Sequence, residues 1–307
     1  MTLAAFTKIF PSDAALTLVD VGSAGGLQPR WRPFEPILSA VLFDPREAAP
    51  SGALGRGQRR VYPVALGREA GQATLNILAL PNMSSTLAPN RALLSGFRKK
   101  GAHSEVVSTE TLPIEPLDAI AERDDFAPDV LKVDTQGSEL EILQGARASL
   151  ERSVLVAEVE VSFVERYVGQ PLFDEIVRFM RDAGFDLIEL SRIKRYRALN
   201  KAGVANVGLG GGQRAGQIAY GDAIFLRNEE IILQRARNDS GVSLMKAIVA
   251  LVAYGKPDLA ARLFDRGADA LDPAQRDRLS SALKALGGAA FGLRHLHAAM
   301  DWLGRKV

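Results

Sequence analysis

The feature that most constrains the fold is a series of short, nearly continuous apolar runs rich in Val, Leu and Ile. They span residues 16–21, 41–44, 61–66, 130–134 and 154–163. Such runs are typical of parallel strands buried on both faces, whereas a half-exposed strand alternates apolar and polar residues. Helical patterns lie between them, at residues 33–40, 117–123, 138–148 and 171–183. This alternation predicts a doubly wound α/β sheet.

Two further pairs of expected strands depart from the alternation. Residues 73–80 and 106–114 flank a loop rich in Pro, Asn and Ser at 81–90. Residues 186–196 and 218–227 are joined by a glycine-rich connection that has no helical pattern. A connection without a crossover helix favours antiparallel pairing. Parallel strands closed by an antiparallel hairpin are characteristic of class I methyltransferases, which have a Rossmann-like fold.

The chain changes character after residue 227. The segment 229–307 is rich in Ala, Leu and Arg, and its apolar residues recur at helical spacing. We expect three or four helices there. The sequence therefore predicts two domains, residues 1–227 with the strand pattern and a small helical domain at 228–307. The helical domain is a candidate dimer surface, substrate lid or docking unit for a protein partner.

Composition limits the functions that the chain can serve. Its 307 residues, 47% of them apolar, are enough for one large core and a small added unit. The formal charge of +2 gives no indication of nucleic-acid binding. The absence of cysteine excludes disulfides, thiolate metal sites and a thiol nucleophile. We find no metal-binding motif, signal peptide or 18-residue apolar run, and we expect a cytoplasmic protein without a metal.

A glycine-containing loop follows the first expected strand. It includes Asp20, Gly22, Ser23, Ala24 and Gly25. Glycine permits a tight turn and a close approach of the backbone to a ligand. Doubly wound folds bind nucleotides at this position, the carboxyl end of the first strand. These five residues are therefore candidate cofactor ligands, and an ordinary glycine turn is the alternative.

The spacing in this loop distinguishes two kinds of cofactor. A dinucleotide fingerprint, G-x-G-x-x-G, leads directly into a helix whose N-terminus binds a pyrophosphate. Here the glycines are spaced G-x-x-G-G, and Pro29, Pro33 and Pro36 prevent a long helix from starting at once. The carboxylate of Asp20 suits an ammonium group better than a phosphate. S-adenosylmethionine has an ammonium and a sulfonium but no phosphate, so it is the expected cofactor; a nicotinamide-dependent oxidoreductase is the alternative.

The ends of the next two expected strands add further candidate cofactor ligands. Asp44 ends the second strand, where an acid can bind both ribose hydroxyls of an adenosine. That role is common to both cofactors, and an Asp that opens a turn before Pro45 is the alternative. Ala65 and Leu66 end the third strand and are assigned to the same cofactor site.

The segment around Lys132 is the most informative part of the sequence. Strand alternation places Lys132 on the same face as Asp134. A lysine in a central strand is costly to bury without a partner. The expected partners are Asp134 on the same strand and Glu158 or Glu160 on the next. Charges gathered at the carboxyl end of adjacent strands indicate a functional site, and a structural ion network is the alternative.

At these residues the chain resembles the FkbM family of methyltransferases. Residues 132–139 are similar to the family's K-x-D-x-Q-G-x-E segment, and residues 19–22 correspond to its cofactor loop. Ser84 and Ser85 lie in a segment that resembles the family's serine-containing loop after the third strand. The resemblance spans about residues 16–227, does not cover the helical tail, and departs from the commoner A-N-x-G loop after the first strand. It implies a class I fold, S-adenosylmethionine and O-methyl transfer.

Methyl transfer to a hydroxyl needs a positioned nucleophile and a group that accepts its proton. Asp134 is the first candidate for this base, or for orienting the substrate, and Glu160 is the second. Lys132 is expected to hold a carboxylate in place, and Ser84, Ser85 and Glu160 to contact the substrate. We therefore expect an O-methyltransferase that acts on a sugar, a glycan or a natural product. A non-catalytic interaction protein on the same scaffold is a further alternative.

Overall fold

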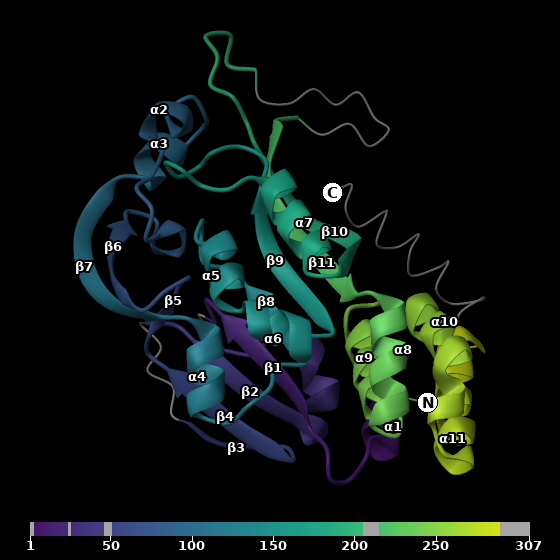
Figure 1. The fold of residues 1–307 in the computed structure, drawn as a ribbon. Coiled ribbons are helices and arrows are strands. Elements are labelled where there is room, and N and C mark those ends of the chain that lie inside the picture. The colour runs from purple at the N-terminus through teal and green to yellow at the C-terminus, as the bar shows by residue number, and fades with distance from the viewer. Residues whose placement is uncertain (1–2, 24–25, 46–50, 205–214, 289–307) are drawn as a thin grey trace.

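The computed structural model describes residues 3–23, 26–45, 51–204 and 215–288, and an eight-stranded sheet forms its centre (Figure 1). The strand order is β10-β11-β9-β8-β1-β2-β4-β3. The strands are β1 (Leu16–Val21), β2 (Leu38–Phe43), β3 (Gly52–Leu54), β4 (Gly57–Tyr62), β8 (Val130–Val133), β9 (Val156–Ser162), β10 (Phe185–Tyr196) and β11 (Gln217–Arg227).

The pairing of these strands confirms the predicted fold class. The strands β4, β2, β1, β8 and β9 pair in parallel, whereas β11 is antiparallel to both β9 and β10. Every residue of β9 is buried, as its continuous apolar run suggests. A doubly wound parallel sheet that ends in an antiparallel hairpin is the arrangement expected of a class I methyltransferase.

A second sheet of three strands adjoins the carboxyl edge of the first. Its order is β5-β7-β6, with β5 (Ala65–Leu66), β6 (Gly71–Leu78) and β7 (Val106–Glu115). The antiparallel pair β6–β7 confirms the expected extra strands. The expected strand at 61–66 is divided between β4 and β5, because Pro63 has no N–H to donate to a ladder.

One face of the main sheet is covered by α4 (Leu117–Arg123), α5 (Glu139–Gly145), α6 (Arg147–Arg152) and α7 (Phe173–Asp182). These helices confirm the patterns at 117–123, 138–148 and 171–183. The helix expected at 33–40 is wrong. A 3₁₀ helix, η1 (Pro29–Ile37), occupies that region and β2 begins at Leu38. Pro33 and Pro36 remove the donors that an α-helix would need there.

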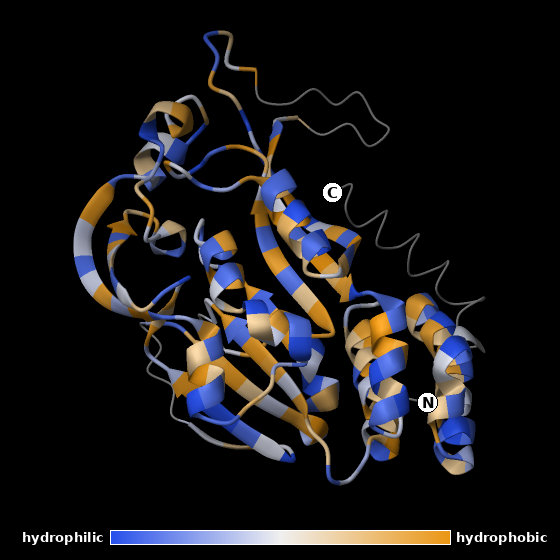
Figure 2. Ribbon diagram, viewed as in Figure 1, coloured by the Kyte–Doolittle hydropathy of each residue, from blue (hydrophilic) through white to orange (hydrophobic). Residues whose placement is uncertain are grey.

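The opposite face is covered by α1 (Ala4–Ile9), η1 and the C-terminal helices. These helices are α8 (Glu229–Asn238), α9 (Val242–Ala253), α10 (Pro257–Gly267) and α11 (Pro273–Gly288), with η3 (Ala268–Ala270) between the last two. Figure 1 shows them gathered beside α1, and Figure 2 shows hydrophobic residues on the strands that they approach. In the described part of this segment, residues 229–288, four α-helices agree with the three or four expected.

The C-terminal helices share a hydrophobic core with the sheet. Leu16 and Leu18 of β1 belong to the same buried cluster as Ile232, Leu244 and Ile248. The cluster occupies the face that a helix after β1 would otherwise cover. The domain division at residue 227 stays a prediction, and residues 289–307 lie outside the described part of the chain. None of the described helices combines the length and apolar character needed to cross a membrane.

Candidate active site

A cavity of about 580 Å³ lies where the parallel strands of the main sheet end. Residues from both sheets line it, together with the loop that contains η2 (Pro81–Met83) and the first residue of α3 (Lys100–His103). Of the candidate site residues, seven line this cavity: Gly22, Asp44, Ala65, Leu66, Ser84, Asp134 and Glu160.

Gly22 forms the turn at the end of β1. Its φ of +80° is in the left-handed region, and its N–H donates to the carbonyl of Phe43 (2.8 Å). A Cβ on this residue would lie 2.0 Å from the carbonyl oxygen of Asp134. The position therefore needs glycine for its conformation and for the close contact with the end of β8. The neighbouring Ser23 is buried, whereas the candidate ligands Ala24 and Gly25 lie outside the described residues.

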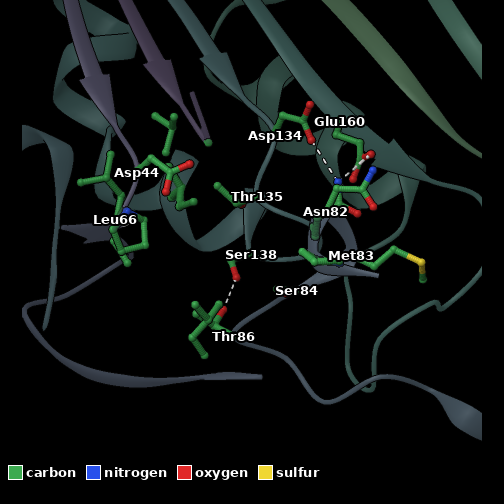
Figure 3. A pocket seen from close by; sticks show the side chains of 18 of the residues that line it. Asp44, Leu66, Asn82, Met83, Ser84, Thr86, Asp134, Thr135, Ser138 and Glu160 are labelled. Atoms are coloured by element: carbon green, nitrogen blue, oxygen red, sulfur yellow. Dashed lines mark hydrogen bonds between the residues drawn. The ribbon is translucent and has the colours of Figure 1, made fainter. Parts of the chain in front are cut away.

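The part of the cavity that is lined by residues from the end of β2 and from β5 is mostly apolar. Ala65 and Leu66 line it together with Phe43 and Val64. Asp44, the first residue after β2, adds a carboxylate to this surface. Figure 3 shows Asp44 and Leu66 on one side of the cavity and Asp134 and Glu160 on the other. This side thus combines apolar residues with one acid.

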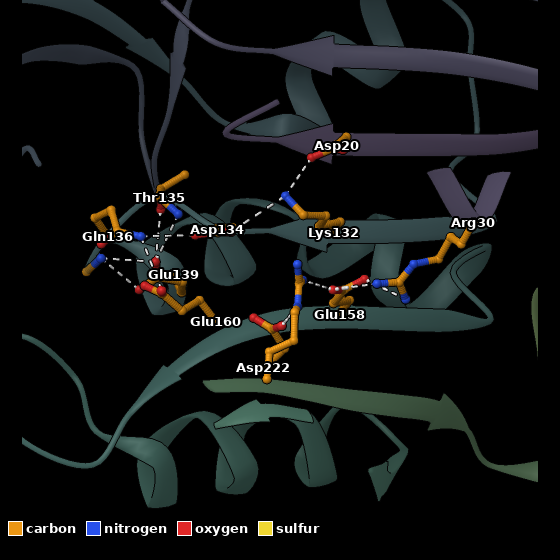
Figure 4. Close-up of polar contacts among 12 residues, drawn as sticks. Asp20, Arg30, Lys132, Asp134, Thr135, Gln136, Glu139, Glu158, Glu160 and Asp222 are labelled. Atoms are coloured by element: carbon orange, nitrogen blue, oxygen red, sulfur yellow. Dashed lines mark hydrogen bonds and ion pairs between the residues drawn. The ribbon is translucent and has the colours of Figure 1, made fainter. Parts of the chain in front are cut away.

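Lys132 is buried within the sheet and does not line the cavity. Its Nζ lies 2.9 Å from Asp20 Oδ1 and 3.8 Å from Asp134 Oδ2, and the Lys132 and Asp20 side chains are only 8% and 3% exposed. Burial opposes the charged lysine, but the carboxylates of Asp20, Asp134 and Glu158 outweigh it and raise the pKa of Lys132. The expected contact with Asp134 is confirmed, although Asp20 on the neighbouring strand is the closer partner (Figure 4).

The two glutamates expected near Lys132 have other ion-pair partners. Glu158 pairs with Arg30 (3.3 Å) and Arg192 (2.5 Å), on the side of the sheet that faces η1. Glu160 pairs with Arg166, whose guanidinium nitrogen lies 2.6 Å from Glu160 Oε2. The expectation that one of these glutamates forms an ion pair with Lys132 is therefore wrong for the described structure, although the charge of Glu158 still raises the pKa of Lys132. Both Asp20 and Glu158 lie opposite Lys132 in the strand registers, but Glu158 is engaged by Arg30 and Arg192, and the Lys132 ammonium pairs with Asp20.

Gln136 connects the two carboxylates that face the cavity. Its Nε2 donates to Asp134 Oδ1 (3.1 Å) and to Glu160 Oε1 (3.2 Å). Its own Oε1 accepts from Arg166 (3.2 Å) and from the Tyr167 hydroxyl (3.4 Å). Gln136 adopts φ +63°, a left-handed backbone conformation that few residues other than glycine occupy. A left-handed turn after β8 thus directs this amide between Asp134 and Glu160.

Glu160 is a buried acid with an altered proton affinity. Burial raises its pKa to about 8, even though the positive charge of Arg166 acts in the opposite direction. The nearby carboxylates of Asp134 and Glu139 add to the rise. Because its side chain still lines the cavity, Glu160 can exchange a proton with a bound molecule near neutral to mildly alkaline pH.

Glu139 stabilises the turn that carries Gln136. Its Oε1 accepts from the Thr135 and Gly137 backbone N–H groups, each at 3.0 Å. Glu139 is buried and points away from the cavity, into the turn. The last acid of the Lys132–Glu139 segment thus has a structural role that fixes Asp134 and Gln136 in position.

The two candidate serines occupy different positions. Ser84 lines the cavity, and its Oγ accepts from the N–H of Leu78 (3.2 Å). Ser85 is buried, does not line the cavity, and donates to the carbonyl of Gln136 (2.7 Å). Ser85 therefore attaches the η2 loop to the turn after β8.

Four cavity residues with charged or phenolic side chains were not among the candidates from the sequence: Lys100, Arg166, Tyr196 and Tyr220. Arg166 follows β9 in an irregular segment, and no local pattern marks it. The buried Glu160 was the available signal, because a buried acid requires a partner. Tyr196 is the last residue of β10 and Tyr220 lies near the start of β11, and only the folded sheet brings them to the cavity.

Comparisons with known proteins indicate the family of this chain. The profile of the Methyltransferase FkbM domain matches residues 34–187. No curated protein matches the chain. The chain is similar to a crystal structure of Methyltransferase FkbM from Methylobacillus flagellatus KT, at 13% identity and a TM-score of 0.33. That match covers 69% of this chain and 43% of the other, so the chain spans less than half the length of that structure.

A second similar structure is a Precorrin-6y C5,15-methyltransferase from Geobacter metallireducens GS-15. It shares 11% identity at a TM-score of 0.27, and the match covers 73% of this chain and 88% of the other. The domain profile extends from η1 to β10 and includes Asp44, Asp134 and Glu160. With half of its residues in that domain, the chain belongs to the FkbM family of methyltransferases.

Proposed function

We propose that this methyltransferase uses S-adenosylmethionine to methylate a hydroxyl group of a sugar, a glycan or a natural product. The observation that supports this most is the cavity itself. One of its sides combines an acid with an apolar surface, and the other carries two carboxylates bridged by Gln136. The first suits an adenosine, and the second suits a reacting hydroxyl.

The residues that line the cavity fit the cofactor. Asp44 is at the right strand end to bind the ribose hydroxyls, and Ala65 and Leu66 offer an apolar surface for the adenine. Gly22 lets the loop after β1 approach the end of β8 closely, and the methionine part would lie above these two strand ends. Asp134 supplies a negative charge for the ammonium group. S-adenosylmethionine would supply a methyl group already activated by a sulfonium.

We assign proton acceptance to Glu160. The acceptor oxygen would form a bond to the methyl carbon as the bond from that carbon to the sulfonium sulfur breaks and S-adenosylhomocysteine leaves. The hydroxyl proton would pass to a Glu160 carboxylate oxygen. A pKa of about 8 suits this task near neutral pH, because an acceptor works best when its pKa is close to the operating pH. Gln136 and Arg166 hold the carboxylate in place. Asp134, held by Lys132 and Gln136, then orients the cofactor.

The C-terminal helices contribute to stability rather than to chemistry in this proposal. No described residue that lines the cavity comes after Tyr220. Residues 228–288 instead bury one face of the sheet through a shared cluster that includes Leu16 and Ile248. Residues 1–227 would thus carry the whole site, and residues 228–307 would support it.

Transfer of an isotopically labelled methyl group tests the proposal. The full chain is incubated with S-adenosylmethionine that carries ¹³C in its methyl group, together with methyl glycosides of neutral hexoses and of glucuronic acid. NMR then identifies the atom that receives the label. We expect an O-methyl signal that depends on Glu160 and is lost in Glu160→Gln. Label on nitrogen or carbon would contradict O-methylation, and a Glu160→Gln enzyme of unchanged rate would refute the assigned base.

A further inference from the structure

Lys100 brings a positive charge into the cavity beside two tyrosines. It is half-buried at the start of α3, and its Nζ lies 4.4 Å from the centre of the Tyr196 ring. Tyr220 packs edge-on against Tyr196, with ring centres 6.0 Å apart. The ammonium group of Lys100 thus lies over the Tyr196 ring at the edge of the cavity, where a cation–π contact holds it.

The other charges that line this part of the cavity are paired within the protein. Arg166 is bound to Glu160 at 2.6 Å, and Asp134 lies 3.8 Å from Lys132. By contrast, no carboxylate in the described part of the chain forms an ion pair with Lys100. Burial and the neighbouring Arg166 both lower the pKa of Lys100. A half-buried ammonium beside a guanidinium gains substantially from an added anion.

The backbone around Lys100 fixes its position. Lys99 adopts a left-handed conformation (φ +65°), which turns the chain into α3. Arg98 N–H donates to the carbonyl of Arg197 (2.9 Å), so this segment is attached to the end of β10, next to Tyr196. The lysine is therefore directed into the cavity by a strained and anchored turn, not by a freely moving loop.

The position of Lys100 separates it from the carboxylate of the proposed cofactor. The methionine part would lie above β1 and β8, at Gly22 and Asp134. Tyr220 is on β11, three strands from β1 in the sheet order, which corresponds to roughly 14 Å at ordinary strand spacing. An anion at Lys100 thus belongs to the other molecule in the cavity.

We infer that the acceptor carries an anionic group, a carboxylate or a phosphate, which Lys100 binds while Glu160 faces the hydroxyl to be methylated. This inference rests on the proposed function and adds the chemical class of the acceptor to it. The aromatic surface of Tyr196 and Tyr220 would adjoin the apolar part of the same molecule.

Calorimetry with matched probes tests the inference. The full chain is titrated with glucuronate, glucose 6-phosphate and glucose, with and without saturating S-adenosylhomocysteine. We expect at least one anion to bind more tightly than glucose. In Lys100→Met its Kd rises at least about tenfold, as expected for the loss of a charge-assisted contact. Lys100→Arg keeps the binding, and so does Lys99→Met, which removes the exposed neighbouring charge.

Several outcomes would overturn the inference. It fails if neither anion binds better than glucose, if Lys100→Met binds like the wild type, or if Lys99→Met is equally weakened. It also fails if Lys100→Met loses affinity for S-adenosylhomocysteine, because Lys100 would then belong to the cofactor site. Failure of the wild type to bind S-adenosylhomocysteine would instead contradict the proposed function, and the titration without it would still test Lys100.

Discussion

Replacing Gly22 with alanine tests the close contact between the loop after β1 and the end of β8. An alanine with φ near +80° costs about 1–2 kcal/mol relative to its preferred backbone conformations. Its Cβ would also meet the Asp134 carbonyl at 2.0 Å, which the backbone must move to relieve. Such overpacking costs about 1–3 kcal/mol more. We therefore expect Gly22→Ala to lower the free energy of unfolding by about 2–5 kcal/mol.

Gly169 provides a matched control for this prediction. Its φ is +74°, and a Cβ there would meet nothing within 4 Å. Gly169→Ala should therefore show only the conformational cost. Urea unfolding of both variants measures the difference, with similar m-values expected. Because Gly22→Ala displaces the backbone of Asp134, its affinity for S-adenosylhomocysteine should also fall by about tenfold, a loss of roughly 1.4 kcal/mol. Equal destabilisation of the two variants, with intact affinity, would refute the reasoning.

Three further predictions follow from the site and its support. Asp134→Asn should weaken the binding of S-adenosylhomocysteine in calorimetry and lower turnover in the labelled-methyl assay, because it removes the negative charge that faces the ammonium group; unchanged affinity and turnover would remove Asp134 from the cofactor site. The pKa of Glu160 is near 4.5 in the unfolded chain and about 8 in the folded chain, so the free energy of unfolding should fall as the pH rises between these values. Urea unfolding at several pH values should show a smaller fall for Glu160→Gln than for the wild type. Truncation after Arg227 should yield an aggregating or unfolded chain, since it exposes the cluster around Leu16; a folded, monomeric product with cofactor affinity would show that residues 1–227 are independent.

The sequence was sufficient to predict the main architecture because the strands are buried on both faces. Continuous apolar runs predicted β1, β8 and β9. The lack of a helical sequence pattern between residues 196 and 218 predicted the antiparallel β10–β11 pair. The prediction of a helix at 33–40 was wrong because it followed the spacing of apolar residues alone. An α-helix there would also need the backbone N–H donors that Pro33 and Pro36 lack. Sequence patterns also gave no indication that the C-terminal helices would cover the sheet, since their apolar faces do not reveal what they pack against.

The candidate site was predictable only where its residues lie close together in the sequence. The segment from Lys132 to Glu139 contains Asp134 and Gln136, which both reach the cavity. Pairing across strands was less accessible, because the Asp20–Lys132 contact depends on strand order and register. Arg166 comes from an irregular segment and Lys100 from the start of the four-residue helix α3. Both enter the site only through tertiary contacts, so no periodicity or motif marks them.

Calorimetry with S-adenosylhomocysteine and NAD tests the central claim most directly. We predict that the full chain binds S-adenosylhomocysteine at one site and does not bind NAD. Asp44→Asn should weaken this binding at least about tenfold, because it removes a charge-assisted contact to the ribose. Binding of NAD without S-adenosylhomocysteine would contradict the proposed cofactor and the assignment of this cavity.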